Sequence, residues 1–275
     1  MQHLEHFSNG WVNPVLAYLV SFIGAVLGLR CAVHAESAAN PAGWLTAAAV
    51  ALGGTGIWVM HFTAMIGFAI TGATVRYDVG RTLLSAVMAI VVVLAGLSIV
   101  TRGRREEIAL PVGGTVTGLG VVAMHYLGMS AMSTGTVITY RVVPVALSVI
   151  IAVVASTAAL WFMLHVRGSL TTLGAAAIMA LAVVGMHYTA MAAVRSHAPL
   201  TSQAVDGVAP KALLLPLISA VAAVVVTLVI MVGLAEIETA DTGEAAADEP
   251  SRTPMLSGTD PAALSTDRRA WPRRP

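Results

Sequence analysis

The chain has 275 residues and a net charge of +1; 57% of its residues are hydrophobic, only 11% are charged, and its mean hydropathy is +0.83. A soluble domain carries about 25% charged residues, so most of this surface must face something other than water. The near-neutral charge excludes nucleic-acid binding through bulk charge, and the single cysteine excludes an internal disulfide or a multi-cysteine metal site.

Seven apolar stretches are long enough to cross a membrane as helices, which takes about 20 residues each. Short segments between them carry the charges and prolines that are typical of loops. The stretches are Val12–Val33, Trp44–Ile70, Arg81–Thr101, Ala109–Met132, Val142–His165, Ser169–Val194 and Ala212–Ala235. The sequence therefore predicts an all-α, polytopic membrane protein with about seven transmembrane helices, surrounded by lipid.

The C-terminal segment 237–275 is rich in Ala, Thr, Ser, Pro and charged residues and has no apolar period. This composition predicts a disordered tail that follows a membrane domain covering residues 1–236. The tail is too short and polar to be a catalytic domain, and the chain contains no Ser–His–Asp, Walker or Gly-rich nucleotide motif. We therefore expect that the protein is not an enzyme.

Basic residues close to the helix ends indicate the orientation in the membrane. The two sets of loops carry equal numbers of them, but Arg102, Arg104 and Arg105 form one dense cluster between the third and fourth helices. This cluster favours a cytoplasmic third loop. The N-terminus is then predicted outside and the C-terminus in the cytoplasm.

A motif of the form Met-His-aromatic-x-small-Met occurs three times, in the second, fourth and sixth predicted helices. The copies are Met60–Met65, Met124–Met129 and Met186–Met191, and their histidines are 64 and 62 residues apart. Because this distance equals one helix pair with its loops, we predict three parallel two-helix repeats (helices 2–3, 4–5 and 6–7) plus an extra N-terminal helix. The three histidines are then expected at one depth, around a pseudo-threefold axis near the membrane normal.

Residues four apart share one face of a helix, so each motif histidine lies in line with the last methionine of its motif. Imidazole suits several transition metals, whereas thioether sulfur selects soft ions, above all Cu(I). The motifs contain no carboxylate, which argues against magnesium, calcium and di-iron sites. The candidate metal ligands are His61, Met65, His125, Met129, His187 and Met191, with Met60, Met124 and Met186 on a neighbouring face as auxiliary ligands.

Packing alone could explain a single copy of this motif, because methionine fills gaps in apolar cores and one histidine can join two helices by a hydrogen bond. Three copies at one depth favour a functional site, since intramembrane ionisable residues are costly. Three alternatives to a permanently bound copper ion stay open. They are a transporter of copper or a small molecule, a haem protein with histidine axial ligands, and a structural protein whose histidines only join helices.

The threefold motif resembles the MHYT-domain family of bacterial integral membrane sensors. The resemblance covers about Phe7 to Ala235 and includes Asn13–Tyr18 and Gly28–Cys31. It implies a seven-helix domain in the bacterial cell membrane, with the motifs near the outer face. It also implies that the ligands named above bind copper, Cu(I) or Cu(II), and that the protein senses a diatomic gas such as O2, CO or NO.

This chain departs from the family pattern in two motif positions, with Phe62 in place of a tyrosine and Leu127 in place of a threonine. Many relatives also carry cytoplasmic domains that make or hydrolyse cyclic di-GMP, or a histidine kinase. This sequence instead ends in a short tail. The resemblance therefore implies a sensor that signals through a cytoplasmic or membrane partner.

Overall fold

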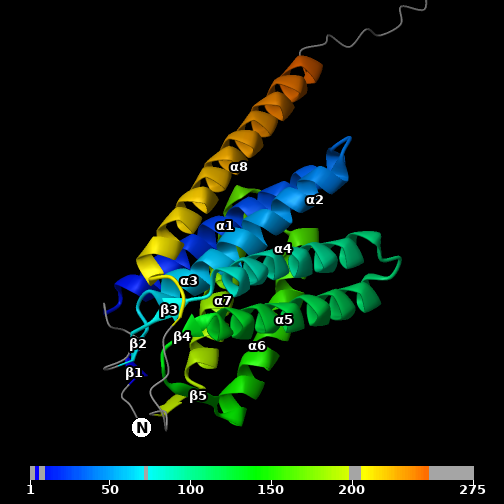
Figure 1. The fold of residues 1–275 in the computed structure, drawn as a ribbon. Coiled ribbons are helices and arrows are strands. Elements are labelled where there is room, and N and C mark those ends of the chain that lie inside the picture. Colours follow the sequence, from blue (N-terminus) through cyan, green and yellow to red (C-terminus); the bar gives the residue numbers. More distant parts are fainter. Residues whose placement is uncertain (1–3, 6–9, 71–73, 198–205, 248–275) are drawn as a thin grey trace, which may run out of the picture. The chain divides into compact units, whose positions relative to one another are not determined.

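The structure, a computed structural model, describes residues 4–5, 10–70, 74–197 and 206–247 (Figure 1). Among these residues, seven helical spans are long and apolar enough to cross a membrane, which confirms the predicted fold class. The second span is continuous but comprises three helical segments. The elements are α1 (Val12–Ser37), α2 (Pro41–Ala49), the π-helix η1 (Val50–Val59), α3 (Met60–Met65), α4 (Val79–Arg102), α5 (Glu106–Ser130), α6 (Val142–His165), α7 (Ser169–Met191) and α8 (Pro210–Ala247).

The first six spans form a closed ring. Going around it, α1 packs against the second span, η1 against α4, α4 against α5, α5 against α6, α6 against α7, and α7 against α1. The last span is outside this ring, where Leu228 of α8 packs against Leu27 of α1 and Ala51 of η1. The second span, Pro41–Met65, is the most buried of the seven.

Small residues allow the helices of the ring to approach closely. A Cβ atom on Gly24 of α1 would lie only 2.4 Å from the backbone nitrogen of Gly56, and one on Gly118 of α5 would lie 2.6 Å from the Cα atom of Val153. Neither position has space for a larger residue. These contacts fix the distance between neighbouring helices and so position the side chains on the ring's inner face.

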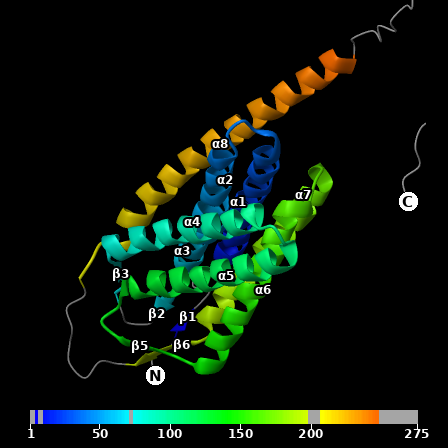
Figure 2. The ribbon, with the colours of Figure 1, turned by 90° about the vertical axis from the view of Figure 1, so that its right-hand side faces the viewer.

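Three short antiparallel strand pairs lie at the end of the bundle where the motif helices finish (Figures 1 and 2). They satisfy backbone groups in the loops, which lack the internal hydrogen bonds of a helix. The pairs are β1 (Leu4–Glu5) with β2 (Ala69–Ile70), β3 (Arg76–Tyr77) with β4 (Met132–Ser133), and β5 (Val137–Tyr140) with β6 (Val194–His197).

The strand pairs group the helices differently from the sequence repeat. In each pair, one strand comes just before a helix without a motif, and the other comes just after the motif helix that follows it. The strands thus join α1 to the second span, α4 to α5, and α6 to α7. The sequence repeat pairs each motif helix with the helix that follows it, whereas the backbone pairing ties each motif helix to the helix that precedes it. The helix α1, which carries no motif, is linked to the second span in this way.

The predicted disordered tail differs from the structure over its first residues. The helix α8 continues through Ala247, so residues 237–247 are helical, while the rest of the tail, 248–275, lies outside the described residues. The segment is rich in alanine and glutamate, which are good helix formers, and extending an existing helix needs no new nucleus. By its contacts the chain divides into two units, Met1–Ala235 and Glu236–Pro275.

Candidate metal centre

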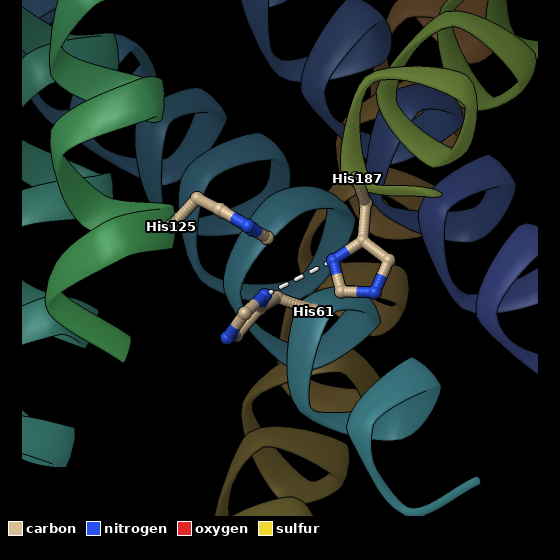
Figure 3. Close-up of side chains that lie close together, drawn as sticks. All are labelled: His61, His125 and His187. Atoms are coloured by element: carbon tan, nitrogen blue, oxygen red, sulfur yellow. Dashed lines mark hydrogen bonds between the residues drawn. The ribbon is translucent and has the colours of Figure 1, made fainter. Parts of the chain in front are cut away.

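The three motif histidines meet inside the ring, each from a different helix (Figure 3). His61 is on α3, His125 on α5 and His187 on α7, and each is 1% exposed. Their ring centroids form a nearly equilateral triangle with sides of 4.9, 5.0 and 5.2 Å, and the ring planes are inclined to one another by 75° to 81°. We call these three residues the histidine triad. It has the pseudo-threefold arrangement at one depth that the sequence predicts.

The triad lies close to one end of the bundle because each motif occupies the last turn or so of its helix. His61 is four residues before the end of α3, His125 five before the end of α5, and His187 four before the end of α7. With a rise of about 1.5 Å per residue, the rings are therefore within roughly 10 Å of the strand-bearing surface.

The hydrogen bonding of the triad leaves several nitrogen atoms available. The Nδ1 atoms of His61 and His187 are 3.1 Å apart and share one hydrogen bond, so one of them carries the proton and the other accepts it. Among the described residues, His61 Nε2 and both ring nitrogens of His125 are buried and have no hydrogen-bond partner. Buried polar atoms normally have one, so these three nitrogens are the kind of exception that points to a ligand.

The positions of the triad nitrogens fit a metal ion. One ring nitrogen from each histidine can be chosen so that all three lie within 4.8 Å of one another. Two imidazoles that bind one metal at about 2.0–2.1 Å place their nitrogens roughly 3.3–3.6 Å apart, so small side-chain rotations suffice. The donor set, three neutral imidazoles without a carboxylate, suits zinc, copper, iron or nickel better than magnesium or calcium.

The aromatic residue that follows each histidine packs edge-on against it. The ring pairs are His61 with Phe62, His125 with Tyr126 and His187 with Tyr188, at centroid distances of 4.8, 5.0 and 5.1 Å and angles of 85° or 86°. Phe62 makes this contact as well as the two tyrosines do. The contact therefore needs the aromatic ring and not the hydroxyl, so phenylalanine in place of tyrosine at this position preserves it.

Two of these aromatic residues also connect the triad to the surface strands. The ring of Phe62 packs against that of Tyr77 of β3 with the ring centroids 5.8 Å apart, and the ring of Tyr126 packs against that of Tyr140 of β5 with the centroids 5.3 Å apart. Burial raises the pKa of both strand tyrosines, and Tyr126 raises the pKa of Tyr140 further. Both tyrosines are therefore neutral phenols at physiological pH.

Gly128, on the last turn of α5, provides the space that the His61 ring occupies. A Cβ atom at this position would lie 2.7 Å from His61 Nε2. The sequence pattern contained a signal for this residue, because the fifth motif position is always small (Ala64, Gly128, Ala190). It did not show which copy faces a histidine of another helix.

All six methionines that the sequence predicts as ligands are buried. Met65, Met124, Met129, Met186 and Met191 belong to the main apolar core, and Met60 packs in a separate small cluster with Ala17 and Ala64. Packing is thus one role of these side chains. Their role as metal ligands stays a prediction.

Other histidines with a described position are away from the triad. His34 stacks on Trp44, and His165, at the end of α6, stacks on Trp161 and pairs with Glu106. Both lie at the opposite ends of their helices from the strand-bearing surface, as expected for interfacial residues.

The fold and the triad define this protein as a multi-pass membrane protein with a buried threefold histidine centre. The chain belongs to the MHYT-domain family of bacterial integral membrane sensor proteins. The family model, described as a bacterial signalling protein N-terminal repeat, matches residues 54–111 and 118–176, which include the first two motif histidines. The third motif lies outside these ranges.

Several curated signalling proteins are similar to this chain. The bifunctional diguanylate cyclase/cyclic di-GMP phosphodiesterase MucR of Pseudomonas aeruginosa is 42% identical over 155 residues, which are 54% of this chain and 22% of that protein. The cyclic di-GMP phosphodiesterase NbdA of the same organism is 34% identical over 191 residues (67% and 24%), and the signalling protein YkoW of Bacillus subtilis 31% over 161 residues (56% and 20%). No solved structure matches the chain.

The chain spans less than a quarter of the length of these relatives, and the matches cover its MHYT region. The enzyme activities in their names therefore describe those proteins and are not assigned to this chain. That this chain itself is not an enzyme stays a prediction.

Proposed function

We propose that this protein is a membrane sensor that binds copper at the histidine triad and responds to a diatomic gas (O2, CO or NO) or to a change of redox state. The observation that carries the proposal is the meeting of three buried imidazoles from three separate helices, where His61 and His125 have ring nitrogens without a hydrogen-bond partner among the described residues. When bound, copper would supply a redox-active centre with affinity for such gases. The Cu(I) state would be favoured if thioether ligands join the imidazoles.

The residues of this chain would bind the ion and transmit its state. His61, His125 and His187 would be the main ligands. Met65, Met129 and Met191, one turn beyond them, would complete the set, with Met60, Met124 and Met186 as auxiliary ligands. Because each histidine is on its own helix, a change in ligand geometry would shift the last turns of α3, α5 and α7 relative to one another. Such a change becomes a signal only if the gas prefers one helix arrangement over the other.

The signal would travel along these helices to the opposite membrane face. The exposed cluster of Arg102, Arg104 and Arg105 between α4 and α5 lies at that face and supports a cytoplasmic location for it. The N-terminus and the triad would then be on the outer side, and the C-terminus inside. A cytoplasmic or membrane signalling partner would read the helix movement.

Two rival functions fit the geometry less well. A haem sandwiched by two of the histidines would need space for a macrocycle, whereas the ring centroids are only 4.9 to 5.2 Å apart. A transporter would need polar side chains along a path away from the triad. One turn beneath it, the described residues instead line a cavity that is apolar except for Thr117 and Ser156.

The experiment that tests the proposal is the copper content of the purified protein after growth with the metal. We expect about one copper per chain in the wild type and background copper in the triple variant His61→Ala, His125→Ala, His187→Ala. His165→Ala, which removes a histidine outside the triad, is the matched control and should keep its copper. Equal copper in the wild type and the triple variant, with both folded by circular dichroism, would refute the triad as the site.

A further inference from the structure

A cavity of about 40 Å³ lies inside the ring, directly beneath the triad. Ile57, Val121 and Val183 line it, and each of them is four residues before a triad histidine on the same membrane span. Residues four apart share a helix face, so the cavity and the triad are adjacent levels of one interior. Met186, the residue before His187, also lines the cavity.

The size and lining of the cavity indicate what it can hold. A buried water needs roughly 10–15 Å³ and two to four polar partners, whereas apolar cavities stay dry and bind apolar molecules such as xenon. Two hydroxyls contribute to this lining, those of Thr117 and Ser156, and Thr117 donates its proton to the Val92 carbonyl at 3.4 Å. The cavity therefore suits a small uncharged apolar molecule better than water or an ion.

The cavity has one side that is not fully enclosed. Its lining residues on η1, α4 and α5 are buried, whereas the half-buried ones are all on α6 and α7: Ala155, Ser156, Ala159, Ala182 and Val183. Both helices expose large apolar side chains, such as Val154 and Ile178, as lipid-facing helices do. We call the gap between these small residues the α6–α7 portal.

Comparison with the preceding repeat explains why the portal occurs at this place. The bounds of α6 lie 63 residues after those of α4, so Val92 of α4 corresponds to Ala155 of α6. The motif of α7 lies 62 residues after that of α5, so Gly120 of α5 corresponds to Ala182 of α7. At the α4–α5 contact, Val92 fills the space beside Gly120, since a Cβ atom on that glycine would lie 2.4 Å from a Val92 methyl carbon. At the α6–α7 contact two alanines replace this pair, and the valine methyl groups that close the gap are missing.

We infer that the cavity and the α6–α7 portal form a binding site for one apolar molecule of diatomic size, which enters from the lipid and is held next to the histidine triad. Small apolar gases dissolve readily in hydrocarbon, so a lipid-facing portal takes them from the phase where they are most concentrated. This inference rests on the proposed function only in its last step, the meeting of the molecule with a metal at the triad.

Xenon is the probe that tests the site, because it is apolar, of suitable size and needs no metal. Crystals of the metal-free protein are pressurised with xenon, and its position and occupancy are read from anomalous scattering. The test variant Ala155→Val with Ala182→Gly recreates the Val92–Gly120 pair, which the same fold already accommodates. The lipid-facing variant Val154→Leu is the matched control.

We expect a xenon atom between η1, α5 and α7 in the wild type, the same occupancy in Val154→Leu, and an occupancy at least fivefold lower in the double variant. Two results would overturn the inference: xenon bound elsewhere but not in this cavity of the wild type, or equal occupancy in the double variant. If the double variant does not fold, the single variant Ala155→Val serves, and the wild-type xenon position alone can still refute the site. Copper content does not enter this test, so its outcome is separable from that of the metal proposal.

Discussion

His125→Leu is expected to weaken copper binding strongly while making the metal-free protein more stable, not less. Both ring nitrogens of His125 are buried without a hydrogen-bond partner among the described residues. Leucine has a similar volume and no polar atom, so the change removes the cost of an unpaired buried group, which amounts to about 1–3 kcal/mol. Copper affinity should fall by more than about 100-fold, because losing a residue that only orients a ligand already lowers metal affinity by about 10- to 100-fold and losing the ligand itself lowers it further.

The matched variant is His61→Leu, which breaks the hydrogen bond between His61 and His187. It should lose copper equally but leave the stability of the metal-free protein unchanged or lower. The free energy of unfolding, measured by denaturant titration in mixed micelles without metal, separates the two variants. If His125→Leu destabilises the metal-free protein by more than His61→Leu does, the histidines join helices and the structural alternative is favoured.

Gly128→Ala should weaken copper binding although it changes no candidate ligand. The new methyl group would lie 2.7 Å from His61 Nε2, so the His61 ring must move out of the triad. The His61–His187 hydrogen bond would lengthen, and the three nitrogens would no longer lie within 4.8 Å. We expect a loss of copper affinity of about 10- to 100-fold, the size seen when a ligand loses its orienting partner.

Gly185→Ala provides the control, because it makes the same change on α7 at a position where a Cβ atom would meet nothing within 4 Å. Both variants gain helix propensity, so any common effect on stability cancels in the comparison. Copper titrations of the two proteins measure the difference. Equal affinities would mean that the His61 ring is not held against α5 in the metal-bound protein.

Much of this fold could be predicted from hydrophobic pattern alone. A membrane span needs about 20 apolar residues, and the charged loops separate the spans clearly, so the number of helices was predictable. The repeat of the motif also predicted that the three histidines meet, because nearly equal spacing in parallel two-helix units places them at one depth of the membrane. One helix, Val142–His165, has the predicted bounds, since Arg141 and Arg167 flank it closely.

Other features depend on contacts between segments that are far apart in the sequence. The strand pairs are two to four residues long, too short for a recognisable alternating pattern, and they form only when loops that are far apart in the sequence meet. The π-helix η1 also has no signal in the residues of the second span. The fit between Gly128 and His61, and the portal left by Ala155 and Ala182, require the relative rotation of neighbouring helices, which a repeat in the sequence does not determine.

X-ray absorption at the copper edge tests the central claim most directly, because it identifies the atoms bound to the ion. The copper-loaded wild type should show imidazole nitrogens at about 2.0–2.1 Å, with a sulfur scatterer at a longer distance if a motif methionine joins the site. The same measurement on His125→Leu should show one imidazole fewer, or no bound copper. A wild-type spectrum without imidazole scattering, or one that His125→Leu leaves unchanged, would contradict a copper site at the histidine triad.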